Sequence, residues 1–277
     1  MPTLISRVAR STTAITLAVA LGSGSVAAIS LLSVQDEIQM GRDAQAELLR
    51  EVPVVRDHAV RQYVESLGRE LASHASGADY PYSFTTADYR DLNAFALPGG
   101  PIWINRGVLD AAGTEAQVAG VLAHEIAHVA GRHSARHLTK SLVTTGILLA
   151  LGAAMDARED DWRAQVVNLA AMVTAGSVML KFSRNDEKQA DREGVRLLEQ
   201  AGYDPRGLLE FMQMLDAQQA RSPNAVVRFL STHPDPKSRV RDLDRMIGTP
   251  GPGRPDSAEF VAVKQRLGRL APAQAMP

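Results

Sequence analysis

Two histidines and a glutamate in the segment His124-Glu-Ile-Ala-His128 have the spacing of a metal site. Residues four apart lie one turn above each other on an α-helix, so His124 and His128 would present two imidazoles to one point. A tetrahedral zinc ion needs this from two of its ligands. Glu125 lies about 100° around the helix from His124, where it could accept a proton from a water that the metal holds. The pattern predicts two metal ligands and one general base, the arrangement of the His-Glu-x-x-His metalloproteases.

The residues around this motif decide between a zinc site and a chance match on a surface helix. Apolar residues occupy the sides of the helix that flank the histidines: Val118, Val121, Leu122, Ile126 and Val129. Their positions predict a buried helix. Because burying two imidazoles and a carboxylate costs free energy unless they are paired or bind a metal, the zinc site is favoured.

A third protein ligand must come from elsewhere in the chain. Glu187 and Asp191 are four residues apart on one face of a second predicted helix. If Glu187 binds the metal, Asp191 lies one turn away and could accept the second N–H of a ligand histidine. Read alone, the segment would be an exposed charge cluster with ion pairs to Lys188 and Arg192. The helix that carries His124 and His128, called the zinc helix below, still needs a third ligand, so the metal-ligand interpretation of Glu187 is favoured.

Composition limits the classes of function. The chain has 277 residues, 45% of them apolar and 22% charged, enough for one substantial domain or two small ones. The formal net charge of -1, without a basic patch carrying interleaved aromatic residues, predicts no nucleic-acid partner. The absence of cysteine excludes disulfides, a cysteine nucleophile and thiolate metal ligands. Any metal must therefore use histidine and carboxylate ligands.

The N-terminal segment has the features of a secretory signal. Arg7 and Arg10 precede an apolar run at residues 14–21, and small residues lead to Ala28, after which we expect cleavage. The predicted location is therefore the periplasm or cell envelope of a bacterium. The alternative is a retained membrane anchor, because residues 14–32 are about long enough to span a bilayer.

Hydrophobic periodicity predicts a mainly α-helical fold with a small β-sheet (α+β). Helical spacing runs through residues 34–49 and 56–73, and strand-like runs occur at residues 82–86, 93–97 and 101–105. A small sheet beside the zinc helix offers an edge to which an extended peptide substrate could add through backbone hydrogen bonds. The alternative is a hairpin that only supports the helix, and the two are compatible.

The zinc helix would also carry His133 and His137 if it continued past Gly131. The two residues would then lie about 180° and 220° around from His124, so we expect them to face away from the metal. They are excluded as ligands on this ground, although a bend at Gly131 would weaken the exclusion.

Two further apolar runs, at residues 142–155 and 166–179, are each short for a transmembrane helix. We expect them to form a helical hairpin buried in the fold. The alternative is a hairpin lying on a membrane surface as a peripheral contact.

Four motifs occur in an order that resembles one zinc-protease family: residues 93–100 (NAFALPGG), 124–128 (HEIAH), 187–191 (EKQAD) and 231–234 (STHP). The family is that of HtpX and the CAAX prenyl proteases, peptidase family M48, and the similarity is to its periplasmic, BepA-like branch. The resemblance covers roughly residues 34–247 and implies a gluzincin-type fold with a small edge sheet. It matches His124, His128 and Glu187 to the ligands of one Zn²⁺ per chain. It matches Glu125 to the catalytic glutamate and Asp191 to the supporting acid.

The last motif contains His233. In BepA-like proteins the matching histidine can occupy the open zinc position and block water, so the resemblance implies a self-inhibiting plug. Alternatively, His233 or Arg239 stabilises the oxyanion formed during attack. A purely structural loop is the third interpretation.

We expect the chain to divide into a signal peptide (residues 1–28), a zinc metalloprotease domain (34–247) and a Pro/Gly linker with a short C-terminal helix (248–277). The last part has no room for an array of helical repeats of about 34 residues, so we expect the partner-binding platform of longer BepA-like proteins to be missing. The predicted function is a zinc endopeptidase that cleaves unfolded or misassembled envelope proteins in protein quality control. The alternative is a chaperone or assembly factor with a mainly structural zinc site.

Overall fold

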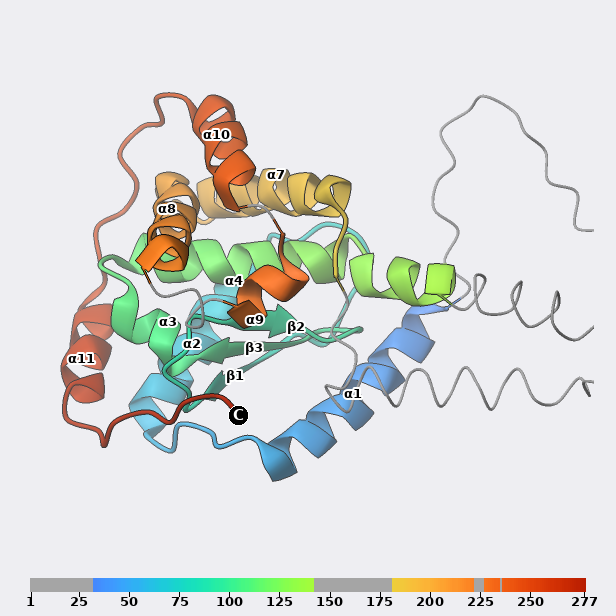
Figure 1. Ribbon diagram of the computed structural model, residues 1–277, viewed down its shortest axis with the longest axis horizontal. Helices are drawn as coiled ribbons and strands as arrows, with labels where there is room; N and C mark the ends of the chain where they lie inside the picture. The colour runs from blue at the N-terminus through green and yellow to red at the C-terminus, as the bar shows by residue number, and fades with distance from the viewer. Residues whose placement is uncertain (1–31, 142–180, 222–226, 235) are drawn as a thin grey trace, which may run out of the picture.

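The structure is a computed structural model that describes residues 32–141, 181–221, 227–234 and 236–277 (Figure 1). The predicted signal peptide at residues 1–28 and the apolar runs at residues 142–155 and 166–179 lie outside the described residues. Among the described residues, no helix combines the length and apolar character needed to cross a membrane.

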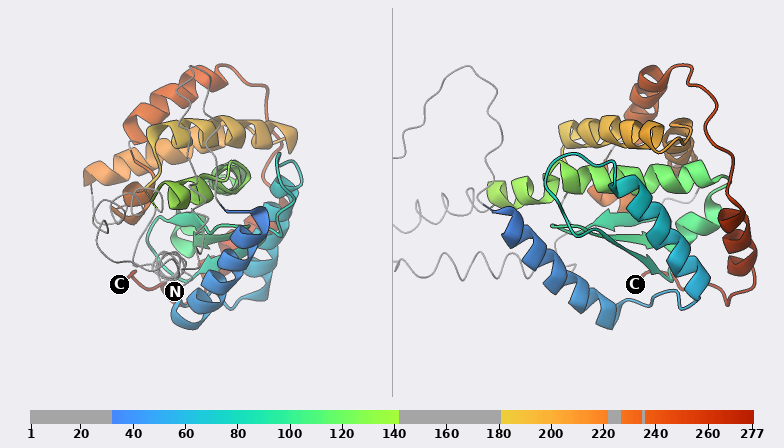
Figure 2. Two further views of the ribbon diagram at one scale, coloured as in Figure 1. Left: turned by 90° about the vertical axis from the view of Figure 1, so that its right-hand side faces the viewer. Right: turned by 180° about the vertical axis from the view of Figure 1, so that it is seen from behind.

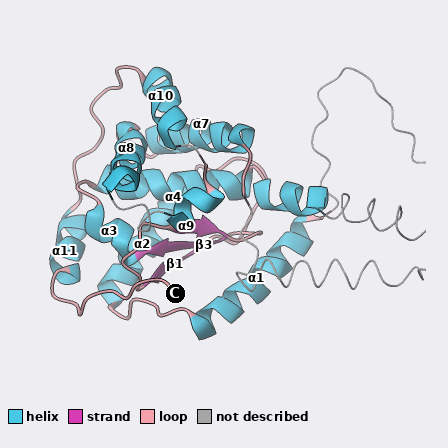
Figure 3. Ribbon diagram, in the orientation of Figure 1, coloured by secondary structure: helices cyan, strands magenta, loops and turns pink. Residues whose placement is uncertain are grey.

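The labelled helices and strands are, in chain order, α1 (Val34–Glu51), α2 (His58–Ala72), β1 (Ser83–Ala87), β2 (Ala94–Ala96), β3 (Pro101–Asn105), α3 (Arg106–Ala111), α4 (Glu115–Ala130), α7 (Arg184–Gln200), α8 (Arg206–Arg221), α9 (Val227–Thr232), α10 (Pro236–Ile247) and α11 (Ala258–Leu267). Residues 133–141, after the turn that ends α4, are also helical. Helices dominate, and the strands form one small sheet (Figure 3). The predicted fold class is confirmed.

The sheet has β3 at its centre. β1 pairs with β3 in parallel and β2 pairs with it in antiparallel orientation, so β2 is an edge strand. Successive residues of a strand point to opposite faces. Ile102 and Ile104 accordingly enter the main hydrophobic core, whereas Trp103 joins a second cluster with Ala44 of α1.

The helix α4 lies at the centre of the fold, between the sheet and a layer formed by α7 and α8 (Figure 1). Seen from behind, α2 runs beside β1 and α4 (Figure 2). Such surroundings suit a helix that is apolar nearly all round. A Cβ at Gly120 would lie 2.7 Å from the backbone nitrogen of Leu208, so glycine allows α8 to approach closely.

The helix α7 brings acidic residues against α4. It begins with a capping box, in which Ser183 and Asp186 satisfy each other's backbone N–H groups. Further along, Gly194 passes the backbone of His124: a Cβ at this glycine would lie 3.4 Å from the nitrogen of His124. This close packing turns Glu187 and Asp191 inward, and both are buried.

The last helices complete the same body. α10 packs against α8 and α7. α11 packs against α2, and its Phe260, Val263 and Leu267 belong to the main hydrophobic core. The C-terminal helix therefore shares a core with α4.

Candidate metal centre

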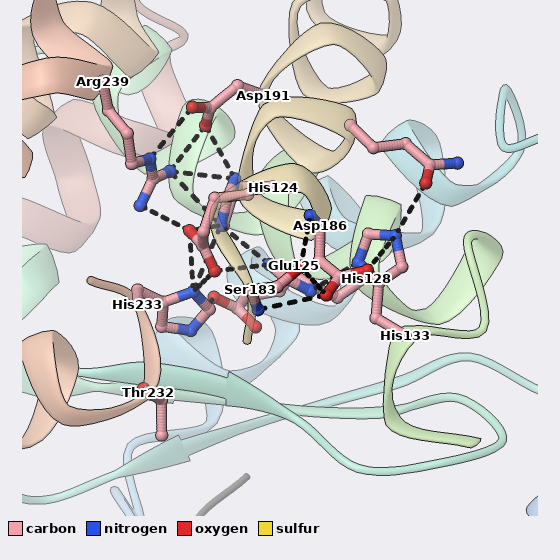
Figure 4. A network of polar contacts seen from close by, with 12 residues as sticks. His124, Glu125, His128, His133, Ser183, Asp186, Asp191, Thr232, His233 and Arg239 are labelled. Carbon is pink, nitrogen blue, oxygen red and sulfur yellow. Dashed lines mark hydrogen bonds and ion pairs between the residues drawn. The ribbon is translucent and has the colours of Figure 1, made fainter. Parts of the chain in front are cut away.

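Four buried side chains from three parts of the chain meet at one point. His124 and His128 come from α4, Glu187 comes from α7, and His233 directly follows α9. One ligand atom of each lies within 4.8 Å of the ligand atoms of the others. In Figure 4 the three imidazoles point towards a common centre. We call these four residues the ligand cluster.

The distances within the ligand cluster fit a tetrahedral cation. His124 Nε2 lies 3.0 Å from His128 Nε2 and 3.3 Å from His233 Nδ1. The carboxylate oxygens of Glu187 lie 3.5 Å from each of the first two nitrogens and 3.0 Å from the third. Bonds of roughly 2.0–2.1 Å from a tetrahedral zinc ion place its ligand atoms about 3.3 Å apart. The residues therefore fit a zinc ion in donor type and in spacing.

A carboxylate and a guanidinium surround the His124 side of the cluster. Asp191 Oδ1 lies 3.1 Å from His124 Nδ1. Arg239 on α10 donates from Nε to Asp191 Oδ2 over 2.9 Å, and its Nη1 lies 2.7 Å from Glu187 Oε2 (Figure 4). The buried guanidinium thus pairs with two buried carboxylates, which on their own would repel each other.

These contacts shift the pKa values of the cluster. Burial would raise the pKa of Glu187, but His233 and Arg239 outweigh burial and hold it well below its usual range. Arg239 and His124 lower the pKa of Asp191 in the same way against burial. Burial and Arg239 oppose a charge on His124, yet its hydrogen bonds to Asp191 and Glu187 raise its pKa to about 9. Surroundings that favour positive charge at this point also favour a cation.

Glu125 is fully buried beside the cluster. Neither of its carboxylate oxygens has a hydrogen-bond partner among the described residues, and His233 Nε2 lies 3.5 Å from Oε1. An unpartnered buried carboxylate costs free energy. Its position suits a group that exchanges a proton with a molecule bound at the cluster.

His233 is held in the cluster by α9. Its backbone N–H donates to the carbonyl of Phe229 over 2.8 Å, and its ring stacks on the ring of Phe229 with centroids 4.6 Å apart. His233 Nδ1 faces Glu187 while Nε2 faces Glu125. One imidazole therefore stands between the predicted ligand and the predicted base.

The chain turns sharply after α4, and this turn overturns one expectation. Gly131 is the C-cap of α4, and Arg132 adopts a left-handed backbone with φ 54°. His133 is thereby brought back against His128, with their Nδ1 atoms 2.8 Å apart. The expectation that His133 faces away from the site was wrong. Neither His133 nor His137 belongs to the ligand cluster of the described residues.

Further groups on the His128 side come from parts of the chain that sequence spacing does not connect to the histidine motif. The ring of Phe182 lies 4.0 Å from that of His128, centroid to centroid. His133 Nε2 lies 3.3 Å from Gln189 Oε1. Burial and the nearby Arg136 lower the pKa of His133 to about 4, so it is neutral at physiological pH. A glycine after the histidine motif signalled the helix end, but not the direction that the chain takes next.

Comparison with known proteins adds a family match. A model of Peptidase family M48 matches residues 58–247. These residues include α4, α7 and every member of the ligand cluster.

Several curated proteins are similar over most of the chain. The Beta-barrel assembly-enhancing protease of Escherichia coli (strain K12) is 32% identical over 246 residues, which are 86% of this chain and 50% of that protein. The Putative beta-barrel assembly-enhancing protease of Vibrio cholerae is 33% identical over 231 residues, 79% of this chain and 45% of that protein. The Mitochondrial metalloendopeptidase OMA1 of Schizosaccharomyces pombe is 28% identical over 219 residues, which are 78% of this chain and 62% of that protein. The chain spans about half the length of the first of these relatives.

Proposed function

The chain belongs to peptidase family M48, whose members are zinc metalloproteases, and from this premise we propose that it is a zinc-dependent endopeptidase. One observation carries the proposal. The ligand atoms of His124, His128 and Glu187 are buried together at separations that suit one zinc ion. The unpartnered carboxylate of Glu125 lies beside them.

The proposed reaction is hydrolysis of a peptide bond by water. A zinc ion at the cluster would lower the pKa of a bound water towards roughly 7 and polarise the scissile carbonyl. Glu125 accepts the proton of the attacking water and later passes it to the leaving amine. Asp191 keeps Nε2 of His124 directed into the cluster by binding Nδ1. Arg239 is committed to two carboxylates, which makes it a poor donor to the oxyanion.

We propose that an extended stretch of substrate adds to the edge strand β2. This strand is paired on one side only among the described residues and packs beside α4. Backbone hydrogen bonds to an edge strand hold a peptide largely independently of its side chains. Such binding suits unfolded protein segments.

We further propose that His233 inhibits the site in the conformation described here. Its Nδ1 atom supplies a fourth donor at the cluster, where a hydrolytic zinc ion keeps a position for water and substrate. Its Nε2 atom lies against Glu125, the proposed base. Activity then requires the segment that follows α9 to withdraw this imidazole.

The same closed cluster favours a second candidate function. Zinc sites with four protein ligands are usually structural. A chaperone or assembly factor for envelope proteins would need the ion only to join α4, α7 and the segment after α9. The two candidates differ in what removal of His233 does to peptide hydrolysis.

The proposed substrates are unfolded or misassembled proteins of the bacterial envelope. Residues 1–28 would direct export to the periplasm, and the apolar runs at residues 142–155 and 166–179 would decide any peripheral contact with a membrane. Fractionation of the expressed chain, with a carbonate wash of the membranes, tests this location. Recovery of the unprocessed chain in the cytoplasm would contradict it.

Three variants test the proposed activity on a casein-type unfolded substrate. Glu125→Gln should keep zinc, measured by metal analysis, while cleavage falls by at least a hundredfold. Glu187→Ala should lose zinc and cleavage together. His233→Ala should raise cleavage if this residue is a plug and lower it if it assists catalysis. Full cleavage by the Glu125→Gln variant would exclude the proposed mechanism, and absence of cleavage by both the parent and the His233→Ala variant would favour the chaperone.

A further inference from the structure

The two ligand histidines on α4 are each held at Nδ1, but by different partners. His124 Nδ1 faces the carboxylate of Asp191, and His128 Nδ1 faces another imidazole, Nδ1 of His133. The rings of His128 and His133 are both buried, and they meet nearly perpendicular, at 83°, with centroids 4.7 Å apart. The contact of 2.8 Å between two nitrogens is a hydrogen bond, so one nitrogen carries the proton and the other accepts it.

The cluster determines which nitrogen donates. A neutral imidazole has one N–H, and a nitrogen that binds a cation must present its lone pair. His128 directs Nε2 into the ligand cluster, 3.0 Å from His124 Nε2. Its proton must therefore be on Nδ1, which makes Nδ1 of His133 the acceptor. An imidazole that accepts at Nδ1 has no proton there, so His133 is neutral and its one proton is on Nε2.

The other side of His133 agrees with this assignment independently. Its Nε2 lies 3.3 Å from Oε1 of Gln189. The same oxygen lies 3.3 Å from Nη2 of Arg136. Arginine can only donate, so the oxygen of the Gln189 amide, not its nitrogen, must face this point. Nε2 of His133 therefore meets an acceptor and donates to it.

We propose that His133 is a positioning residue that holds His128 in the Nδ1–H tautomer, with Nε2 free to bind the metal. The hydrogen bonds run in one direction, from His128 to His133 and from His133 to Gln189. The inference rests on the proposed function, because it takes the cluster to be a metal site. It adds a second residue, besides Asp191, that orients a ligand imidazole.

The turn after α4 is built around this contact. Arg132 is fixed in its left-handed conformation by hydrogen bonds to Glu37 (Nε to Oε1, 2.6 Å) and to the carbonyl of Leu32 (Nη2, 2.6 Å). A Cβ at Gly131 would lie 2.6 Å from Nε2 of His133, closer than real contacts allow. Only glycine at this position leaves room for the imidazole.

The first test is the tautomer in the parent protein, which does not depend on any variant folding. The chain has seven histidines, so selective ¹⁵N-histidine labelling gives few NMR signals. In the zinc-loaded protein, His133 should carry its proton on Nε2 and His128 on Nδ1. A proton on Nδ1 of His133 would overturn the proposal.

The second test is zinc affinity, measured by competition with a chromophoric chelator. His133→Phe fills the space without an acceptor and should weaken zinc binding about 10- to 100-fold, as removal of such supporting partners does. His133→Asn retains an amide oxygen as acceptor and should recover most of the loss. The matched control is His137→Phe, one helical turn further along. His137 bonds to Asp186 and not to a proposed metal ligand, so this substitution should change zinc affinity less than threefold.

The outcomes separate this inference from the proposed function. A parent protein that binds no zinc refutes both. A parent that binds zinc, together with a folded His133→Phe variant that binds it equally well, refutes the positioning role alone. Equal weakening in the His133→Phe and His133→Asn variants also refutes it, because an acceptor would then not matter.

Discussion

The two ligand histidines of α4 each have a supporting group at Nδ1, but the two groups differ in charge. On the His124 side, the supporting group is an ionised carboxylate, Asp191, whose charge is matched by Arg239 on another helix. On the His128 side, it is the neutral imidazole of His133, five residues further along the chain. We call these the charged side and the neutral side.

The difference follows from how much negative charge the centre can hold. Glu125 on α4 and Glu187 and Asp191 on α7 are already buried at this centre, and Arg239 pairs with the last two. A further carboxylate behind His128 would need a second buried cation. A neutral acceptor fixes the tautomer without this requirement. We therefore expect the charged side to contribute to both folding and metal binding, and the neutral side to act mainly on the metal ligand.

Arg239→Met should produce the largest effect, because it leaves Asp191 and Glu187 buried without their cation. Breaking a buried ion pair in this way costs about 3–5 kcal/mol of folding free energy. Urea denaturation of the parent and the variant, each in a chelator and in zinc, measures the loss. Zinc should recover part of it, since the metal supplies positive charge at the same point.

The control for this substitution is Arg245→Met on the same helix, α10. The side chain of Arg245 is 75% exposed and pairs with Asp242 at the surface. Exposed pairs of this kind contribute roughly 0–1 kcal/mol. Similar losses in the two variants would mean that the charged side has no special part in folding.

The sequence predicts the parts of these two sides that depend on residues close together in the chain, but not the parts that depend on residues far apart. Because an α-helix repeats regularly, spacing predicts that His124 and His128 share one face of their helix. It predicts the same for Glu187 and Asp191 on a second helix. The turn at Arg132 depends on Glu37, which lies 95 residues earlier in the chain. Periodicity carries no information about such a contact. A helix that continued past Gly131 would turn His133 away from the metal, and spacing alone leaves open whether the chain bends there.

The same limit applies to the sheet and to Arg239. Alternating short runs predicted the strands and hence the fold class, which the structure confirms. The pairing order makes β1 and β2 the two outer strands of the sheet, and only the packing shows that β2 is the one beside α4. Arg239 was considered as an oxyanion donor because its partners, on a helix 48 residues away in sequence, could not be inferred from spacing.

Asp191→Asn should have an intermediate effect and separates charge from hydrogen bonding. The amide oxygen can still accept from His124 Nδ1, but the charge that Arg239 pairs with is lost. Zinc affinity should fall about 10- to 100-fold, as measured by chelator competition. On the neutral side, His133→Asn replaces one neutral acceptor by another and should change affinity much less. If the two asparagine variants lose affinity equally, the distinction between the charged and neutral sides is wrong.

Gln189→Met should have the smallest effect on zinc affinity, because Gln189 contacts His133 and not a proposed metal ligand. Gln189 is half-buried, so water can replace its amide oxygen as the acceptor of His133 Nε2–H, and Asp186 Oδ1 lies 4.0 Å from the same nitrogen. His133 therefore keeps its tautomer, and zinc affinity should fall less than fivefold in chelator competition. The control is Lys188→Met, the exposed neighbour on α7, which should leave affinity unchanged. A loss of zinc affinity as large as that of His133→Phe would contradict this. It would mean that the tautomer of His128 depends on the whole series of hydrogen bonds from His128 through His133 to Gln189.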